Sequence, residues 1–413
     1  MNTYTLKDLV TIKNGKDHKH LADGKFPVYG SGGIMRYAES YLYDKPSILL
    51  PRKGTLDNIQ FCEVPFWTVD TSYYTEVNET LCNPYYLYCY LNLLDLSKLN
   101  TGTGVPSMTF DSYYNIKIHL PSKSIQDKIA SFLSTLDRKI SLNRSINAEL
   151  ERMAKEIYDY WFVQFEFPRS VSGESGLPEL SRTDDGNGQS QFPDANGRPY
   201  KSSGGAMVYN PVLKREVPAG WEVKTLSSVC DIFNGATPST KDESNYGGDI
   251  IWITPKDLSD QKSKFTFHGE RNITQKGFSS CSTHMLPKGT ILMSSRAPIG
   301  LVSIASNELC TNQGFKNLVP KEIIDNAYLY YYIKMHIKQI EQLGTGTTFK
   351  EVSREDLVKF PILYISNRDL YKKWYSFVKP IFDKQAMLCQ EIEELTSLRD
   401  ELLPLLMTRQ VEV

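Results

Sequence analysis

Two glycine–threonine loops contain the residues of this sequence that are best suited to contact a phosphate or a nucleic-acid base. The first is Asn100-Thr-Gly-Thr-Gly-Val-Pro-Ser-Met-Thr109, and the second is Leu343-Gly-Thr-Gly-Thr-Thr-Phe-Lys350. Threonine hydroxyls and the amides that glycines expose can donate to phosphate oxygens and base edges. A single loop of this kind is most simply a turn. The two loops occupy matching places in the chain, so we treat both as candidate DNA contacts.

Basic and polar residues in other predicted turns extend this set. Arginine is the side chain best shaped to bind guanine with two hydrogen bonds. Two further similarities between the first and second halves of the chain support the choice. Arg52 matches Arg296, and residues 68–72 match residues 311–315. For each charge the alternative of an ordinary solvated side chain stays open. The candidate DNA contacts are Arg36, Arg52, Lys53, Thr71, Thr101, Thr103, Lys256, Arg296, Asn312, Gln313, Thr345, Thr347 and Lys350.

Motifs for catalysis or metal binding are not found in the sequence. Asn83-Pro-Tyr-Tyr86 resembles the loop with which methyltransferases hold a flipped base, but it lacks the second proline and is better explained as a helix start. Gly30-Ser-Gly-Gly33 is not followed by the lysine and Ser/Thr of a P-loop and is expected to be a plain turn. The six histidines are scattered, and the seven cysteines form no CxxC pair. We expect no catalytic residue and no metal site.

The chain repeats itself over about half its length. Residues 5–15 match residues 225–235 at an offset of 220, and Asn83-Pro-Tyr-Tyr-Leu-Tyr88 matches Asn326-Ala-Tyr-Leu-Tyr-Tyr331 at an offset of 243. Self-similarity of this kind indicates duplicated structural units. The larger second offset predicts about 23 extra residues in the second copy, within residues 240–280.

Two long heptad stripes follow the two copies, at an offset of 245 residues. Apolar side chains spaced alternately by three and four predict helices over residues 124–162 and 370–407 that pack lengthwise. Asn143, Asn147, Gln385 and Arg399 interrupt the stripes, as polar residues that set helix register do. The predicted apolar seam residues are Leu133, Leu136, Ile140, Leu150, Ile157, Trp161, Val378, Ile381, Leu388, Ile392, Leu395, Leu402 and Leu406.

An antiparallel pair of these helices places Asn147 opposite Ile392 and the two copies at opposite ends. About 38 residues at about 1.5 Å each give a rod of about 57 Å, long enough to separate two DNA sites by one helical turn of about 34 Å. Pro380 and Pro404 are expected positions for a kink.

The predicted fold class is α+β, with two homologous mixed α/β regions, two long antiparallel coiled-coil helices and internal pseudo-two-fold symmetry. A net charge of -1 argues against a general polybasic nucleic-acid binder, and no signal-peptide core or membrane span is apparent, so we expect a cytoplasmic protein. The stretch at 169–192 is rich in Ser, Gly and Asp and is expected to be mobile. The predicted boundaries are 1–122 (first region), 123–165 (first helix), 166–205 (linker), 206–366 (second region) and 367–413 (second helix).

This organisation resembles the specificity (S) subunit of type I restriction–modification systems. The resemblance depends on the half-length repeat, the two Gly-Thr loops and the two long helices. Its most specific part is the central connection, Tyr160-Trp-Phe-Val-Gln-Phe-Glu-Phe-Pro168, then Gly197-Arg-Pro-Tyr-Lys-Ser-Ser-Gly-Gly205, then Leu213-Lys-Arg-Glu-Val-Pro-Ala-Gly-Trp221. The insert at 169–192 departs from the family pattern.

The resemblance implies two target recognition domains that each read one half of a bipartite, asymmetric site in double-stranded DNA. It also implies that the helices space the domains and dock two methyltransferase (M) subunits, with restriction (R) subunits added if the system restricts. S-adenosylmethionine, ATP and Mg would then bind the partner subunits, and this chain would be non-catalytic with no cofactor of its own. Three alternatives stay open: a non-DNA coiled-coil adaptor, a fused enzyme with an unrecognised site, and a methylation-only system.

Overall fold

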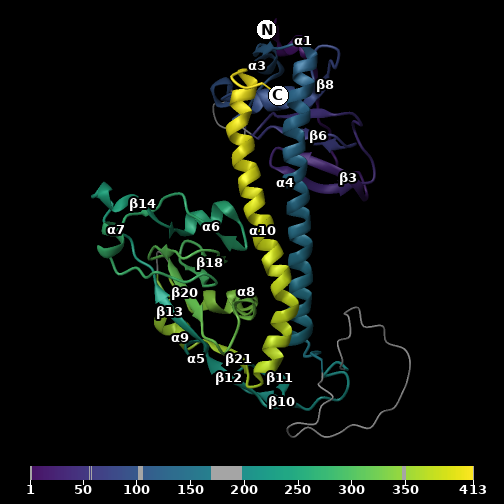
Figure 1. Cartoon of the computed structure of the whole chain (residues 1–413). Coiled ribbons are helices and arrows are strands. Elements are labelled where there is room, and N and C mark those ends of the chain that lie inside the picture. Colours follow the sequence, from purple (N-terminus) through teal and green to yellow (C-terminus); the bar gives the residue numbers. More distant parts are fainter. Residues whose placement is uncertain are drawn as a thin grey trace. The chain divides into compact units, whose positions relative to one another are not determined.

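The computed structural model describes residues 2–54, 56, 58–100, 106–168, 198–346 and 350–412 (Figure 1). The chain divides into two compact units: unit 1 comprises residues 1–142 and 392–413, and unit 2 comprises residues 143–391. The boundary crosses both long helices, α4 (Lys123–Tyr158) and α10 (Arg368–Met407). Each unit therefore contains one copy of the repeat and a segment of each helix.

The first repeat, residues 2–120, lies in unit 1 and consists of short strands and helices. Its sheets have the strand orders β2-β8-β5-β6, β4-β3-β7 and β1-β9. The elements are β1 (Asn2–Thr5), α1 (Leu6–Leu9), β2 (Val10–Asn14), β3 (Asp23–Gly30), β4 (Gly33–Ala38), β5 (Ser47–Pro51), β6 (Gln60–Cys62), β7 (Trp67–Thr68), β8 (Ser72–Val77), α2 (Pro84–Asn92), η1 (Leu96–Leu99), α3 (Phe110–Tyr114) and β9 (Lys117–Leu120).

The second repeat, residues 221–365, lies in unit 2. A π-helical turn, η2 (Asp159–Val163), and the hairpin β10 (Met207–Asn210) and β11 (Arg215–Pro218) precede it. Its elements are β12 (Trp221–Thr225), α5 (Leu226–Val229), β13 (Cys230–Asn234), η3 (Glu243–Asn245), β14 (Tyr246–Ile250), β15 (Trp252–Ile253), α6 (Pro255–Gln261), β16 (Phe265–Thr266), α7 (Gln275–Ser279), β17 (Ile291–Ser295), β18 (Ile299–Ala305), β19 (Cys310–Thr311), β20 (Phe315–Pro320), α8 (Asn326–Gln342), α9 (Arg354–Val358) and β21 (Pro361–Ile365).

The predicted duplication is confirmed by strand order. The main sheet of the second repeat, β13-β20-β17-β18-β16, contains the order β2-β8-β5-β6 of the first repeat and adds β16 at its edge. Gly15 and Gly235 close equivalent turns, where an added Cβ would lie 2.0 Å from the carbonyl oxygens of Val69 and Asn312. A side chain fits in neither turn, which explains why both copies have glycine there.

The extra residues of the second repeat lie where the sequence predicted them. After β3 the first repeat forms a hairpin with β4, and Gly30 pairs with Gly33 at its turn, as expected. After the equivalent β15, the second repeat instead contains α6, β16 and α7. The two repeats therefore share a central sheet and a separate parallel strand pair, β3 with β7 and β15 with β19, and they differ in the segment that follows the first strand of that pair.

Two of the predicted residue matches are wrong by one position. Arg52 N donates to Thr71 O, and Ser295 N donates to the equivalent Gly314 O, so Arg52 matches Ser295 and Lys53 matches Arg296. The strand pairings agree with this, because Leu49 pairs with Tyr74 and Leu292 pairs with Asn317, both at an offset of 243, whereas a match of Arg52 with Arg296 needs an offset of 244.

The second wrong match concerns a helix start. Asn83 caps α2 and Asp325 caps α8, each accepting a hydrogen bond from the main-chain amide of a buried tyrosine three residues later. Asn83 therefore matches Asp325 and not Asn326.

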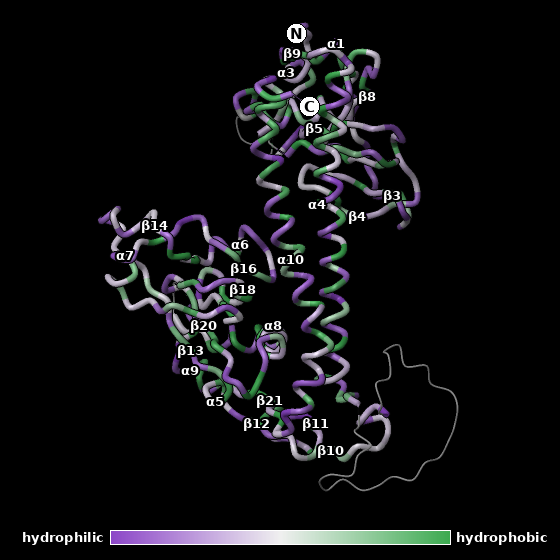
Figure 2. The backbone as a smooth tube through the Cα atoms, viewed as in Figure 1, coloured by the Kyte–Doolittle hydropathy of each residue, from purple (hydrophilic) through white to green (hydrophobic). Residues whose placement is uncertain are grey.

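The long helices follow the predicted stripes, and Figure 2 shows hydrophobic residues interleaved with hydrophilic ones along both. Helix α4 ends at Tyr158 and continues as η2, whereas α10 runs without a break through Pro380 and Pro404. All predicted seam residues are shielded from solvent to some degree. Buried are Leu133, Ile140, Trp161, Val378, Leu388 and Leu406, and partly buried are Leu136, Leu150, Ile157, Ile381, Ile392, Leu395 and Leu402.

Within each unit the two helix segments run antiparallel. In unit 1 Leu133 belongs to the same core cluster as Leu406, and in unit 2 the rings of Tyr158 and Trp374 lie 6.2 Å apart. The predicted pairing of Asn147 with Ile392 is wrong, because Asn147 Nδ2 donates to Cys389 Sγ at 3.2 Å. A heptad stripe defines which face of a helix is buried but leaves the axial stagger of two helices open.

Candidate nucleic-acid interface

Three loops of the first repeat converge beside the carboxyl end of β5. Thr71 O accepts hydrogen bonds from the amides of Arg52 (2.9 Å) and Lys53 (3.3 Å), and Arg52 O accepts one from Met108 N (3.0 Å). Gly54 N donates to Pro106 O at 3.0 Å. Main-chain bonds therefore join three predicted contacts, Arg52, Lys53 and Thr71, to the described C-terminal part of the first Gly-Thr loop. Thr101 and Thr103 lie outside the described residues.

The two basic side chains of this cluster differ in how firmly they are held. Arg52 is partly buried; its Nη1 donates to Asp70 O at 3.2 Å, and its guanidinium lies 5.9 Å from the ring centroid of Tyr73. Lys53 is exposed and has no side-chain hydrogen bond or ion pair within the described part of the chain. Arg52 is thus pre-oriented, whereas Lys53 is available as a mobile positive charge.

The equivalent loops of the second repeat converge in the same way. Ser295 N donates to Gly314 O at 2.7 Å, and Ser295 O accepts from Val352 N at 3.0 Å. Thr345 exchanges two main-chain hydrogen bonds with Glu351, at 3.1 and 3.0 Å. This arrangement brings the predicted contacts Arg296, Thr345 and Lys350 together. Thr347 lies outside the described residues.

Glu351 organises the charges of this second cluster, and sequence reasoning missed it. Its carboxylate lies 3.1 Å from Lys316 Nζ and 3.5 Å from Arg296 Nη1, and the Lys316 side chain is only 7% exposed. A buried lysine is stable only when it is paired. The sequence signal was present, because Lys316 and Asn317 are the two polar residues of a strand whose other residues are apolar, Phe315–Pro320.

Asn312 and Gln313 occupy the turn between β19 and β20 and have different tasks. Asn312 Oδ1 accepts from Gly314 N at 2.8 Å and so shapes the turn. Gln313 is exposed, and its Oε1 accepts a hydrogen bond from the hydroxyl of Thr237. Gln313 is therefore oriented at the surface of the loop, as a side chain that reads a base edge must be.

The structure places Arg36 and Lys256 outside these convergent loops. Arg36 lies on β4, where its Nη2 binds Leu21 O (2.9 Å) and Asp23 (3.0 Å). Lys256 lies in the first turn of α6 and pairs with Glu270 at 2.8 Å, a bond that raises the pKa of Lys256. Both have local structural partners, and their DNA contacts stay a prediction.

In the described part of the chain, no group of three or more His, Cys, Asp or Glu side chains is placed to hold a metal ion. No described helix is both long and apolar enough to cross a membrane.

A family model of the type I restriction modification DNA specificity domain matches residues 1–152 and 218–395. The chain belongs to this family. Each matched segment contains one repeat and most of the long helix that follows it.

Two proteins with similar sequences are named as specificity subunits of type I restriction enzymes. The type I restriction enzyme MjaIX specificity subunit of Methanocaldococcus jannaschii is 43% identical over 159 residues, which are 38% of this chain and 37% of that protein. The HindI specificity subunit of Haemophilus influenzae is 29% identical over 344 residues, covering 76% of this chain and 73% of that protein. The match to the first of these relatives thus spans little more than a third of its length.

A solved structure supports the fold. The S subunit of a type I restriction-modification system from M. genitalium superposes with a TM-score of 0.65 at 15% identity, over 98% of this chain and 95% of that one. At this identity the similarity concerns the fold alone.

The four polar seam residues each bind a partner from the other long helix. In unit 1 Arg399 Nη1 lies 2.8 Å from Asp137 Oδ1, and Tyr85 of the first repeat also donates to Asp137. In unit 2 Asn143 Nδ2 donates to Glu391 at 2.9 Å. Asn147 and Gln385 are bonded to each other, Gln385 Nε2 to Asn147 O at 3.3 Å. Directional contacts of this kind are suited to fixing helix register.

Proposed function

We propose that this chain reads a split, asymmetric sequence in double-stranded DNA for a type I restriction–modification complex. The observation that supports this most is a pair of loop clusters with different side chains on one repeated scaffold. The first presents Arg52, Lys53 and Thr71, and the second presents Arg296 and Gln313. Because base pairs differ in their donors and acceptors, clusters of different composition would read different half-sites.

In this proposal the chain supplies recognition and no catalysis. Two methyltransferase subunits dock on α4 and α10 and contribute S-adenosylmethionine for methylation of adenine. Restriction subunits, where the system has them, add ATP- and Mg-dependent translocation and cleavage. A methylation-only system would differ in its partner subunits and not in this chain.

The net charge of -1 bears on how the chain binds alone. Phosphate contacts supply most of the non-specific affinity of proteins for DNA, and that contribution falls steeply with salt. We expect the isolated chain to bind DNA weakly and to gain affinity from its partner subunits. A salt-resistant, nanomolar complex of the isolated chain with its own site would contradict this expectation.

The test is co-expression with the methyltransferase subunit encoded beside it, in a host free of other DNA methylation. Sequencing that reports modified bases should reveal one split motif with a constant unread gap, modified on both strands. Replacing residues 206–366 by the corresponding region of a relative should change one half of the motif only. If the two proteins co-purify and no base is modified, the adaptor alternative replaces this proposal.

A further inference from the structure

Lys264 is a buried cation in the segment of the second repeat that has no counterpart in the first. It lies between α6 and β16, and its side chain is only 7% exposed. Its Nζ lies 2.7 Å from Glu151 Oε2, 2.9 Å from the Tyr331 hydroxyl and 2.9 Å from Gln385 Oε1. A lysine ammonium has three donors, so all three are used.

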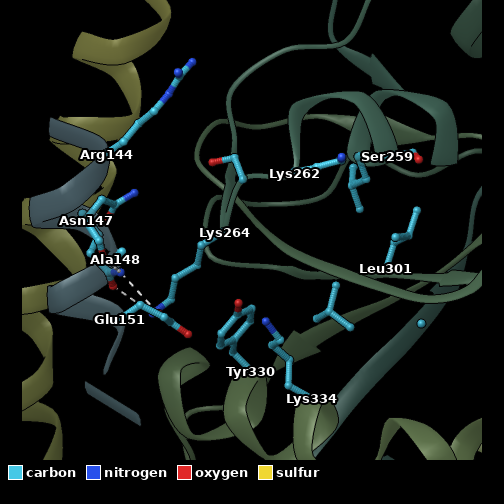
Figure 3. A pocket seen from close by; sticks show the side chains of 15 residues that line it. Arg144, Asn147, Ala148, Glu151, Ser259, Lys262, Lys264, Leu301, Tyr330 and Lys334 are labelled. Atoms are coloured by element: carbon cyan, nitrogen blue, oxygen red, sulfur yellow. Dashed lines mark hydrogen bonds and ion pairs between the residues drawn. The ribbon is translucent and has the colours of Figure 1, made fainter. Parts of the chain in front are cut away.

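The three partners of Lys264 come from three different helices: Glu151 from α4, Tyr331 from α8 and Gln385 from α10. Glu151 also accepts from Tyr331 (3.1 Å) and from Gln385 (3.2 Å), which closes the network. Figure 3 shows the Lys264 side chain extending from the second repeat to Glu151 on the long helix. One ammonium therefore ties the second repeat to both long helices.

Packing of the repeat against the helices is incomplete at this place. A cavity of about 550 Å³ lies beside Lys264, and its lining includes Arg144 and Ala148 of α4 and Ser259 and Leu301 of the second repeat (Figure 3). Phe382 of α10 also lies against Lys264, with its ring centroid 3.5 Å from Nζ. Apolar contacts are non-directional and permit sliding, whereas hydrogen bonds restrict orientation.

A second attachment lies about 10 Å further along α4. There Tyr158 packs against Tyr328 and Tyr331, with ring centroids 5.8 and 5.3 Å apart, and Phe162 packs edge-on against Tyr328 at 4.8 Å. This aromatic cluster supports the second repeat at one place, and the Lys264 network supports it at another, where Phe382 of α10 also packs against Phe265 at 6.0 Å. Without the directional bonds of Lys264, the repeat has room to rock toward the cavity.

We infer that Lys264 fixes the angle of the second repeat on the long helices and thereby makes the protein reject half-site gaps that are one base pair too long or too short. This inference depends on the proposed function. Adding one base pair moves a half-site by about 3.4 Å and rotates it by about 35° around the DNA axis. A rigidly held repeat cannot follow this movement, and a repeat that rocks can follow part of it.

The first repeat has a different attachment. In unit 1 the charges of the corresponding cluster both belong to the long helices, Asp137 and Arg399, and the repeat contributes the Tyr85 hydroxyl. Lys264 is thus a positioning residue specific to the second repeat, and it touches no DNA in this proposal.

The test uses the full chain with its methyltransferase partner. The substrates are unmethylated duplexes that contain the recognised motif with its native gap or with a gap one base pair longer or shorter. The readout is the rate of methylation at altered gaps divided by the rate at the native gap. Lys264→Met keeps the unbranched apolar part of the side chain and removes its three bonds, and this ratio should rise about tenfold, as loss of charged hydrogen bonds suggests. Tyr331→Phe keeps the ring but removes one acceptor of Lys264 and one donor to Glu151; because Lys264 keeps its bonds to Glu151 and Gln385, this change should raise the ratio by less.

Lys262→Met is the matched control, because Lys262 is exposed, lines the same cavity and has no side-chain hydrogen bond or ion pair within the described residues; its ratio should equal that of the wild type. A base change inside the second half-site should reduce methylation equally in all four proteins, because the reading loops are untouched. An unchanged ratio for Lys264→Met and Tyr331→Phe, whether or not overall activity falls, would overturn the inference. If the wild type methylates no split motif at all, the proposed function fails first and the inference fails with it.

Discussion

Asp325 is the buried carboxylate for which the structure makes the most quantitative prediction. It caps α8 through a hydrogen bond from Tyr328 N to Oδ1 at 2.7 Å, and its buried Oδ2 has no partner within the described residues. Burial raises the pKa of Asp325 from 3.8 to about 7. The equivalent residue of the first repeat is Asn83, so Asp325→Asn installs the capping residue that the other repeat already uses.

The direction of the effect follows from proton binding. Because the folded-state pKa of Asp325 is raised, the folded protein binds more protons than the unfolded chain between about pH 4 and pH 7, and its stability falls as pH rises through that window. A shift of about three pKa units corresponds to about 4 kcal/mol. The uncharged amide avoids this penalty, but its NH2 group replaces an oxygen without a partner, at a cost of about 1–3 kcal/mol. We therefore expect a net gain of about 1–3 kcal/mol at pH 8, which turns into a net loss of about 1–3 kcal/mol at pH 4, where the wild-type carboxyl is neutral.

The assay is thermal unfolding followed by circular dichroism at pH 4 to 8. For a unit of this size the gain at pH 8 corresponds to a rise in Tm of roughly 2–10 °C. Asp249→Asn is the matched control, since Asp249 is an exposed carboxylate of the same unit, and its Tm should follow the wild type at each pH. A Tm difference between Asp325→Asn and the wild type that does not change with pH would refute the reasoning.

Two further predictions concern the candidate interface. Glu351→Gln leaves the buried Lys316 ammonium without a carboxylate and should lower the free energy of unfolding by about 2 kcal/mol, measured by urea denaturation, whereas Glu355→Gln, on an exposed side chain, should leave it unchanged; equal effects would contradict the pairing. Lys53→Met should weaken binding of the assembled complex to DNA of any sequence and lower the slope of log affinity against log salt by about 0.9, measured by fluorescence anisotropy. Lys45→Met, an exposed lysine before the opposite end of β5, should not change this slope, and a Lys53 variant with the wild-type slope would exclude a phosphate contact.

The sequence was sufficient for the features that repeat or that have a period. The duplication was visible because Thr5-Leu6 and Asn14-Gly15 recur at a constant offset, and the turn at Gly15 and Gly235 admits no side chain. The long helices were predictable since heptad spacing is a local property of the chain. Loop residues such as Arg52 and Thr71 could be proposed individually, but only hydrogen bonds between distant segments showed that they lie together.

Other features were decided by the tertiary structure alone. The partner of Asn147 depends on the stagger between α4 and α10, and the match of Arg52 with Ser295 is defined by their main-chain hydrogen bonds to Thr71 and Gly314. Glu151, Lys264 and Gln385 lie far apart in sequence and form one network only after the chain has folded. A periodic pattern determines which face of an element is buried. Which residues meet across that face depends on how whole elements pack, and no local signal in the chain contains this information.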